Sequence, residues 1–295
     1  MKNFLIKLNK IAFDTDLYLK KFLLNKKKYK SNLITPMKYG FFSGGKRFRS
    51  SILINTGQIF GINRKKLIII GAAIECVHSY SLMHDDLPAM DDDDIRRGKL
   101  SVHKKFNEFT AILSGNALLT LAFEILSNKN LKISSQKKID LIKTLTLCSG
   151  NFGLAEGQFL DLTFEKKKNS KKKIIDMQKK KTGELFGFCC ECAAIIAGKN
   201  KKIRKDLKSI GIDIGLLFQI TDDLIDYRGN STIAGKPTGV DDKKGKATLV
   251  RLLGYKKTIN LANTIKKTLI KRIKKYGSRA NDLLDSVEFI LDRNF

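Results

Sequence analysis

The scarcity of proline constrains the fold of this chain more than any other feature. Only three prolines occur in 295 residues, at positions 36, 88 and 237. Between them, apolar residues recur three and four positions apart, the spacing that places them on one face of a helix. No segment shows convincing period-two alternation, so the sequence predicts an all-α fold without strands. The clearest helical tracts are residues 68–83, 111–126, 137–164, 182–197, 205–227 and 282–291.

Length and composition are compatible with one globular unit. A chain of 295 residues exceeds the usual ~150 residues per domain, but large helical folds often keep such a length together. Apolar residues make up 42% of the chain, which suffices for a sizeable core. We therefore expect a single domain over residues 1–295, with local linkers only.

Cysteine use and hydropathy bear on location. There is no uninterrupted stretch of ~20 apolar residues that could span a bilayer, and no signal-peptide core. The odd number of cysteines, without Cys-x-x-Cys spacing, indicates neither a disulfide framework nor a cysteine zinc site. We therefore expect a cytoplasmic protein without a membrane span, whose thiols are small core residues: Cys76, Cys148, Cys189, Cys190 and Cys192.

The charge balance is strongly basic, with 57 Lys and Arg against 29 Asp and Glu and a formal net charge of +28. Such an excess is typical of proteins that bind nucleic acid, anionic lipid or phosphorylated substrates. Much of it lies in lysine runs at 26–28, 166–168, 171–173 and 179–181, which we interpret as solvated faces and loops. We therefore expect no nucleic-acid partner, and a nucleic-acid or anionic-surface binder is the alternative from another class.

A first acidic cluster, HDDLPAMDDDDIRRG at residues 84–98, follows an apolar helical tract. Six aspartates in ten residues repel one another and face the negative end of the helix dipole, so a cation is needed to offset them. Oxygen ligands alone suit Mg²⁺. In a continuous helix Asp85 and Asp91 would be about 600° apart. Pro88 breaks the helix and lets both point into one space. A solvated acidic loop is the alternative.

A second acidic cluster, FQITDDLIDY at residues 218–227, lies in an otherwise apolar helix. Asp222 and Asp226 are four residues apart and share one face. Such a pair is costly to desolvate unless it meets a metal or a cation. A surface pair is the alternative for this cluster alone. Two such clusters, each followed by cations, favour a functional site.

Cations of the kind that bind phosphate accompany both clusters. Arg96 and Arg97 follow the first, and Lys236 follows the second. Arginine binds phosphate oxygens in a bidentate fork, whereas lysine acts as a point charge. A third group, GGKRFR at 44–49, combines glycines that permit close approach with Lys46 and Arg49 on one side of a helix start. A simple basic turn is the alternative, and the chain lacks a GxxxxGK[ST] nucleotide loop.

Together these segments resemble the trans-isoprenyl diphosphate synthases, specifically the bacterial farnesyl diphosphate synthases. The match covers nearly the whole chain. One departure is Ser50, where members of the family commonly have proline. The segments that carry the resemblance are GGKRFR (44–49), HSYSLMHDDLPAMDDDDIRRG (78–98), VHKKF (102–106), GQFLDL (157–162), KKTGELF (180–186), FQITDDLID (218–226) and GKPTGVDDKKGKATL (235–249).

The resemblance implies a helical bundle of the isoprenoid synthase type, with a central active-site cavity, that usually forms a homodimer. It implies a Mg²⁺-dependent, head-to-tail condensation of isopentenyl diphosphate with dimethylallyl and geranyl diphosphate, which releases diphosphate and yields farnesyl diphosphate. A geranyl or geranylgeranyl diphosphate synthase is the alternative within the family.

By position, the resemblance also implies residue roles. Asp85 and Asp91, supported by Asp86, would hold two Mg²⁺ ions, and Asp222 with Asp226 a third, so that about three ions grip one diphosphate. The allylic diphosphate would be bound by Arg96, Lys181 and Lys236. Thr182 and Gln219 would direct oxygen dipoles toward the allylic cation. The isopentenyl diphosphate pocket would comprise Lys46, Arg49, His78 and Arg97.

Product length and site closure are the last two expectations. Ser81 lies one helical turn, ~5.4 Å, before Asp85, and Tyr80 lies beside it. A bulky Tyr80 at the pocket floor would stop chain growth early, as in farnesyl synthases. We expect the long segment 227–246 to close over the site and exclude water, because water would quench the cation.

Overall fold

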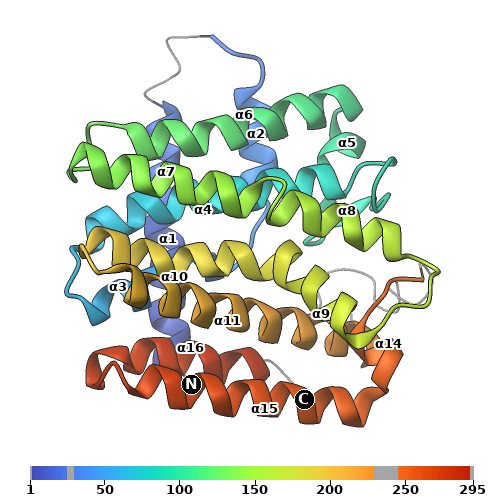
Figure 1. The fold of residues 1–295 in the computed structure, drawn as a ribbon. Coiled ribbons are helices and arrows are strands. Elements are labelled where there is room, and N and C mark those ends of the chain that lie inside the picture. The colour runs from blue at the N-terminus through green and yellow to red at the C-terminus, as the bar shows by residue number, and fades with distance from the viewer. Residues whose placement is uncertain (1, 25–29, 229–244, 293–295) are drawn as a thin grey trace. The chain divides into compact units, whose positions relative to one another are not determined.

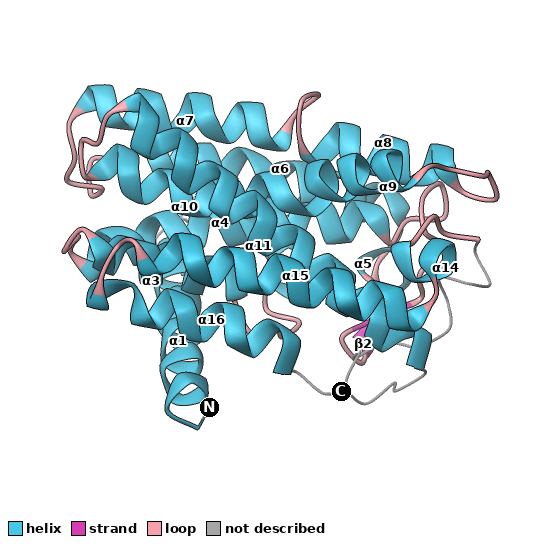
Figure 2. Ribbon diagram, turned by 60° about the horizontal axis from the view of Figure 1, so that its bottom comes forward, coloured by secondary structure: helices cyan, strands magenta, loops and turns pink. Residues whose placement is uncertain are grey.

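The computed structural model describes residues 2–24, 30–228 and 245–292, and Figure 2 shows that these residues are almost entirely helical. The predicted all-α class is thus confirmed. The chain divides into two compact units. The N-terminal unit contains residues 2–54 and 63–142, and the C-terminal unit contains residues 55–62 and those from 143 onward. Each unit is described by itself.

The N-terminal unit is built around a long buried helix, α4. Asn63 begins it, because the Asn63 side chain accepts a hydrogen bond from the Lys65 N–H at 2.9 Å. Helix α4 packs against α6, and the two run side by side in Figure 1. A Cβ on Gly115 of α6 would lie 2.3 Å from His84 Nε2, so glycine permits this close approach. The helices of this unit are α1 (Lys2–Leu24), α2 (Ile34–Phe41), α3 (Phe48–Ile59), α4 (Arg64–Asp85), α5 (Val102–Lys105) and α6 (Glu108–Ser127).

The C-terminal unit is organised around α10 and α11, which lie side by side in Figure 1. Glycines allow the two backbones to meet: a Cβ on Gly215 would lie 2.7 Å from the Cα of Gly183, and one on Gly211 2.3 Å from the Phe186 carbonyl oxygen. The boundary between the units falls within α3 and α7. The elements are α7 (Ser135–Ser149), α8 (Leu154–Phe164), α9 (Lys171–Gln178), the π-helical turn η2 (Lys179–Gly183), α10 (Glu184–Ile196), α11 (Lys201–Arg228), α14 (Leu249–Leu253), α15 (Tyr255–Lys274), the 3-10 turn η3 (Ser278–Ala280) and α16 (Asn281–Asp292).

Two predictions about elements are wrong. The tract 137–164 is not one helix, because the chain turns at residues 150–153, between α7 and α8. The prediction of no strands also fails, since β1 (Ile95–Arg96) pairs antiparallel with β2 (Lys99–Leu100). Arg97 and Gly98 join these strands with φ of 53° and 73°, the left-handed conformation that two-residue hairpin loops require. Four paired residues are too few to leave an alternating pattern in the sequence.

Helices α4 and α6 are each long and apolar enough to cross a membrane by length and composition alone. Within α4, 72% of the apolar window is buried inside the protein, and within α6 the share is 44%. A core helix of a globular protein passes the same criterion, so the observation is weak evidence for a membrane span.

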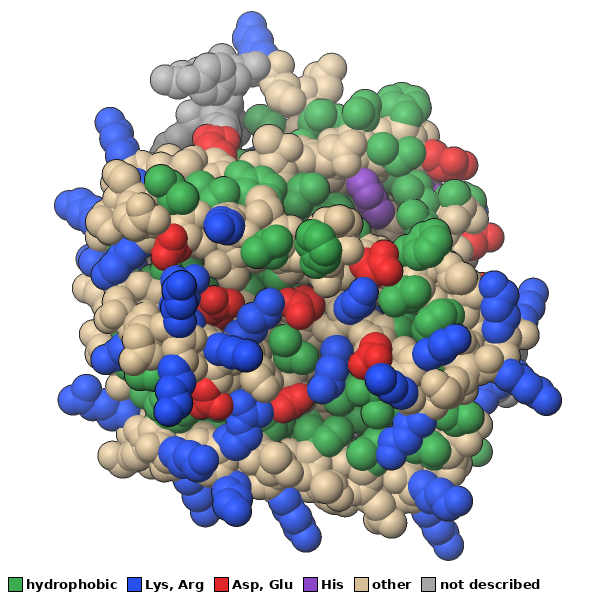
Figure 3. Space-filling view, viewed as in Figure 1, with side chains coloured by type: hydrophobic (Ala, Val, Ile, Leu, Met, Phe, Trp, Pro, Cys, Tyr) green, Lys and Arg blue, Asp and Glu red, His purple; other side chains and the backbone are tan. Residues whose placement is uncertain are grey.

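Charged side chains do not gather in one patch on the face drawn in Figure 3. Lys and Arg side chains are scattered over this face, with Asp and Glu side chains among them. The five cysteines are buried and free, as predicted.

Candidate functional site

The first acidic cluster forms a tight turn at the end of α4. The helix ends at Asp85, with Asp86 as its C-cap. The Asp91 N–H donates to the Asp85 carbonyl oxygen at 2.8 Å, and the Asp93 N–H donates to that of Asp86 at 3.1 Å. The chain therefore folds back after Pro88 and brings the backbones of Asp85 and Asp91 together.

Arg96 is held inside this turn by two carboxylates. Its Nε donates to Asp86 Oδ1 at 2.8 Å, its Nη2 contacts the same oxygen, and Nη2 lies 3.0 Å from Asp93 Oδ2. Asp86 is only 2% exposed. Burial raises the pKa of Asp86 even though Arg96 acts to lower it. Burial would lower the pKa of Arg96, but Asp86 raises it above its usual value, so the guanidinium stays charged. Asp86 thus anchors Arg96, and the role of Asp93 was not predicted.

Arg97 packs against the glycine-rich loop. Its Nη1 donates to the Gly44 carbonyl oxygen. A Cβ on Gly45 would lie 2.6 Å from Arg97 Cζ, and Gly45 has a φ of 110°, so only glycine fits there. Burial, together with the positive charge of Arg47, lowers the pKa of Arg97 to about 10. The structure therefore brings the 44–49 segment and Arg97 into one cationic cluster.

His78 on α4 belongs to this cationic cluster. Burial first, and then the charges of Arg49 and Arg97, hold the pKa of His78 well below its usual value. The imidazole is therefore neutral at neutral pH. Crowded, partly desolvated cations are a favourable environment for an anion, because an anion offsets their repulsion. Arg49 lies in the first turn of α3, whereas Lys46 is exposed in the preceding loop, outside the helix start where it was predicted.

Arg47 has a structural role within the same segment. It is 2% exposed, pairs with Asp16 Oδ1 at 2.8 Å, and donates to the Phe41 carbonyl oxygen at 2.7 Å. Its guanidinium lies 4.3 Å from the centre of the Phe41 ring. These contacts fix the loop that precedes α3. The Ser50 N–H donates to Glu75 Oε1 at 3.0 Å, a bond that proline would not make.

The two residues predicted to limit product length lie on α4 before the acidic turn. The Tyr80 ring is edge-on to His84, with ring centres 5.5 Å apart. His84 Nε2 lies 3.1 Å from the Ile112 carbonyl oxygen of α6. Ser81 is 7% exposed and donates to the His78 carbonyl oxygen at 2.9 Å. Tyr80 therefore lies on the side of α4 from which His84 reaches α6.

In the C-terminal unit, the second acidic cluster lies near the end of α11. Asp222 and Asp226 are one turn apart on this helix, as predicted, and Asp226 is 4% exposed. Asp223, between them, is also buried and accepts hydrogen bonds from Gln178 at 2.7 Å and Gln219 at 2.9 Å. Two amides therefore satisfy Asp223, which the sequence does not assign to the site.

Thr182 and Gln219 form one hydrogen-bonded pair. The Thr182 hydroxyl donates to Gln219 Oε1 at 2.8 Å, while Gln219 Nε2 donates to Asp223. The amide of Gln219 is thus fixed in one orientation, and its oxygen already accepts one hydrogen bond. The structure joins the two residues predicted to face the allylic cation.

Lys181 lies in the π-helical turn η2, a distortion often found at functional sites. Its Nζ lies 2.6 Å from Asp161 Oδ2, and Lys246 Nζ lies 3.0 Å from the same oxygen. Burial alone would raise the pKa of Asp161, but the two ammonium groups lower it below its usual value. Asp161 and Lys246 were missed as site residues, although both lie in segments quoted for the resemblance. Lys236 and most of the predicted closing segment lie outside the described residues.

The chain matches the family model for polyprenyl synthetase over residues 30–287. It is 38% identical over 268 residues to the farnesyl diphosphate synthase of Escherichia coli K12, an alignment that covers 89% of each chain.

Solved structures of other proteins share the fold of this chain over almost its full length. The apo crystal structure of an FPP/GFPP synthase from Zymomonas mobilis has a TM-score of 0.86 and 37% identity, and the alignment covers 98% of this chain and all of that one. A geranyltransferase from Helicobacter pylori, crystallised with magnesium and isoprenyl diphosphate, has a TM-score of 0.82 and 29% identity, covering 97% and 96% of the two chains.

Proposed function

The chain belongs to the polyprenyl synthetase family, and on this premise we propose that it is a farnesyl diphosphate synthase. It would condense isopentenyl diphosphate with dimethylallyl and geranyl diphosphate and release diphosphate at each step. The observation that carries this proposal is the 38% identity to a farnesyl diphosphate synthase across 89% of both chains. The family match over residues 30–287 also supports a single polyprenyl synthase domain, which we propose for residues 1–295.

The two acidic clusters fit magnesium as the metal. Their candidate ligands are all carboxylate oxygens, the donor type that Mg²⁺ prefers, and a backbone hydrogen bond holds Asp85 and Asp91 together. Asp85 and Asp91 would bind ions of the first cluster, and Asp222 with Asp226 a further one, about three in all. When bound, Mg²⁺ stabilises the negative charge that develops on the departing diphosphate.

The cations of each unit would hold substrate. Arg96, oriented by Asp86 and Asp93, and Lys181, oriented by Asp161, would bind the allylic diphosphate together with Lys236. Lys46, Arg49, Arg97 and neutral His78 would bind isopentenyl diphosphate. His78 can donate a hydrogen bond to phosphate without adding charge to a cluster that is already cationic. Thr182 and Gln219, held in one hydrogen-bonded pair, would direct oxygen dipoles at the allylic cation.

The assembly that we propose is a homodimer in the cytoplasm. One face of α6 exposes apolar side chains at helical spacing: Phe109 is 66% exposed, Ile112 41% and Leu113 48%. Large exposed apolar stripes of this kind are typical of protein interfaces. The free, buried thiols suit a reducing compartment.

Purified protein incubated with Mg²⁺, isopentenyl diphosphate and each allylic starter tests the reaction. We expect farnesyl diphosphate as the main product from both dimethylallyl and geranyl diphosphate, and no product after chelation of the metal. Geranyl or geranylgeranyl diphosphate as the main product would replace the proposed product length but keep the reaction class. No condensation with either starter would overturn the proposal.

Tyr80→Ala tests the basis of product length. Removing the ring next to His84 on α4 should lengthen the main product by at least one five-carbon unit, detected by chromatography of the dephosphorylated alcohols. Tyr276→Ala, an equal truncation in the C-terminal unit, is the matched control and should leave chain length unchanged. An unaltered product distribution in active Tyr80→Ala protein would remove Tyr80 from this role.

A further inference from the structure

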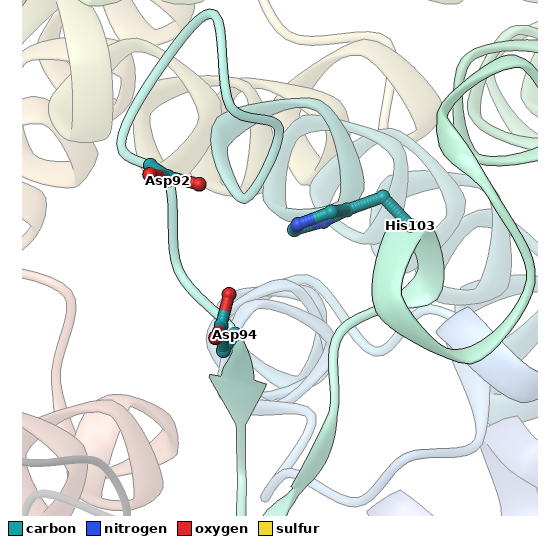
Figure 4. Close-up of side chains that lie close together, drawn as sticks. All are labelled: Asp92, Asp94 and His103. Carbon is teal, nitrogen blue, oxygen red and sulfur yellow. The ribbon is translucent and has the colours of Figure 1, made fainter.

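Two aspartates of the acidic turn and a histidine of α5 form a compact cluster that the proposed reaction does not use. Asp92, Asp94 and His103 each offer one ligand atom, and these atoms lie within 4.8 Å of one another (Figure 4). Asp92 and Asp94 are exposed, whereas His103 is only 6% exposed. The cluster thus has a buried nitrogen at its base and two carboxylates at the surface.

The buried imidazole is oriented toward the carboxylates. His103 Nδ1 lies 3.0 Å from the Ser101 hydroxyl oxygen, and the ring points into the space between Asp92 and Asp94 in Figure 4. His103 Nε2 has no hydrogen-bond partner within the described part of the chain. Buried polar atoms are nearly always satisfied, so a buried nitrogen that faces two carboxylates indicates a ligand between them.

The local backbone holds this geometry. The β1–β2 hairpin joins the two sides, because the Ser101 N–H donates to the Asp94 carbonyl oxygen at 2.8 Å. Asp92 adopts a φ of 49°, an uncommon conformation for a residue other than glycine. Lys104 Nζ lies 3.0 Å from Asp94 Oδ1. Both groups of that pair are substantially exposed, so the pair is weak and Lys104 can swing into solvent.

We propose that Asp92, Asp94 and His103 bind one divalent transition-metal ion of the zinc type, separate from the Mg²⁺ ions assigned above. One imidazole and two carboxylates suit Zn²⁺ or Co²⁺ better than Mg²⁺, which prefers oxygen ligands alone. In the tautomer that binds a metal, Nδ1–H would donate to the Ser101 hydroxyl and leave the Nε2 lone pair for the ion, the usual support of a histidine ligand.

The ligand separations allow such an ion after a small closure. Metal–ligand distances of ~2.1 Å in tetrahedral geometry place ligand atoms about 3.4 Å apart. Because Asp92 and Asp94 are exposed, rotation of their side chains can supply the movement. The ion would tie the loop that carries Arg96 and Arg97 to α5, and thereby stabilise the hairpin between them.

The experiment is a titration of Zn²⁺ into the full-length, metal-stripped protein in excess Mg²⁺, followed by calorimetry, with Co²⁺ spectroscopy in parallel. We expect one Zn²⁺ per chain in the wild type and a Co²⁺ visible band without thiolate charge transfer. His103→Gln and Asp92→Asn should each abolish this binding. Ser101→Ala should weaken it by about tenfold.

Two controls make the assignment specific. Like His103→Gln, His84→Gln removes one of the three histidines, but it should leave Zn²⁺ binding unchanged. Asp85→Asn alters the predicted Mg²⁺ cluster and should keep Zn²⁺ binding too. If His103→Gln does not fold, as judged by circular dichroism, the exposed Asp92→Asn variant decides. No Zn²⁺ binding in the wild type, equal affinity in the His103 or Asp92 variant, loss in Asp85→Asn, or a cysteine signature in the Co²⁺ spectrum would each overturn the proposal.

Discussion

At the scale of residues, the two units differ in how their cationic side chains are arranged: in one they are crowded together, and in the other a carboxylate neutralises them. In the N-terminal unit, Arg49, Arg97 and His78 form a cluster in which burial and positive neighbours disfavour protonation of the imidazole. In the C-terminal unit, one buried carboxylate, Asp161, compensates two ammonium groups. The first arrangement favours an incoming anion, and the second fixes the direction of its lysines.

Because the pKa of His78 is low in the folded protein, the free energy of unfolding should depend on pH in a definite direction. Below the usual histidine pKa of 6.5 the unfolded chain binds a proton at His78 that the folded protein does not bind, so the free energy of unfolding falls as pH decreases. One such group contributes a slope of up to about 1.4 kcal/mol per pH unit. In His78→Gln, the free energy of unfolding should therefore change less with pH between about pH 5 and 6.5 than it does in the wild type.

The matched control is His84→Gln, which removes the other histidine of α4 and should retain the slope of the wild type. A slope in His78→Gln equal to that of the wild type would show that the imidazole is not kept neutral by its surroundings.

Asp161→Asn should destabilise the C-terminal unit, because it leaves Lys181 and buried Lys246 with less counter-charge. Loss of one partner of a buried pair typically costs about 3 kcal/mol. Since the folded pKa of Asp161 is lowered, its contribution to stability is complete above the usual aspartate pKa of 3.8 and is lost as pH falls through the folded pKa. Urea unfolding at several pH values measures this. The exposed Asp285→Asn is the control, and equal losses in the two variants would contradict the assignment.

At the scale of elements, the close packing of η2 and α10 against α11 determines where Thr182 and Lys181 lie. Gly215 of α11 packs against the Cα of Gly183. Gly157 of α8 packs against the backbone of Lys181, and a Cβ on Gly157 would lie 2.0 Å from the Lys181 backbone nitrogen. Two elements, α11 and α8, therefore converge on one irregular turn, and each approach requires glycine.

Gly215→Ala should separate α11 from η2. The added methyl would lie 2.7 Å from the Gly183 Cα and 3.0 Å from Phe186 Cδ2, so overpacking should lower the free energy of unfolding by about 1–3 kcal/mol. In an open helix the same change would stabilise the protein, because alanine has the higher helix propensity. The sign of the change in a chemical denaturation midpoint is therefore decisive, and a raised midpoint would refute the contact.

Helix periodicity predicted the centres of α4, α6, α10, α11 and α16, but their ends and interruptions depend on other interactions. The break between α7 and α8 falls at residues 150–153, where a Cβ on Gly153 would lie 2.0 Å from the Cys148 carbonyl oxygen. The hairpin of β1 and β2 depends on the left-handed Arg97, a conformation that residue type does not predict.

At the scale of the whole molecule, the exposed stripe on α6 is the surface that we expect to mediate dimerisation. Phe109→Asp combined with Leu113→Asp would place two charges in that proposed interface and should convert the proposed dimer to monomers in sedimentation velocity. Phe13→Asp, at a position 65% exposed on α1 in the same unit, is the control and should remain dimeric. A monomeric wild type, or a dimer that survives both substitutions, would contradict this interface.

The sequence predicts those parts of the candidate site that consist of chemically distinctive residues close together in the chain. The pairing of Asp222 with Asp226 follows from charge and helix geometry, and that of Asp85 with Asp91 from charge and the helix break at Pro88. The partners that orient the cations were not: Asp93 is one of four consecutive aspartates, and Asp161 is a single acid more than 80 residues before Lys246. Only the folded chain shows which acid meets which base.

The π-helical turn at residues 179–183 has a consequence for comparing this chain with others. An extra residue in one turn rotates everything after it by about 100° relative to a regular helix. The face of α9 is therefore out of phase with that of α10, although the two are continuous in sequence. An alignment can treat residues 171–196 as one uniform helix, or place a one-residue gap in the lysine run at 179–181. Either choice would place the Lys181 ammonium group on the wrong face of the helix.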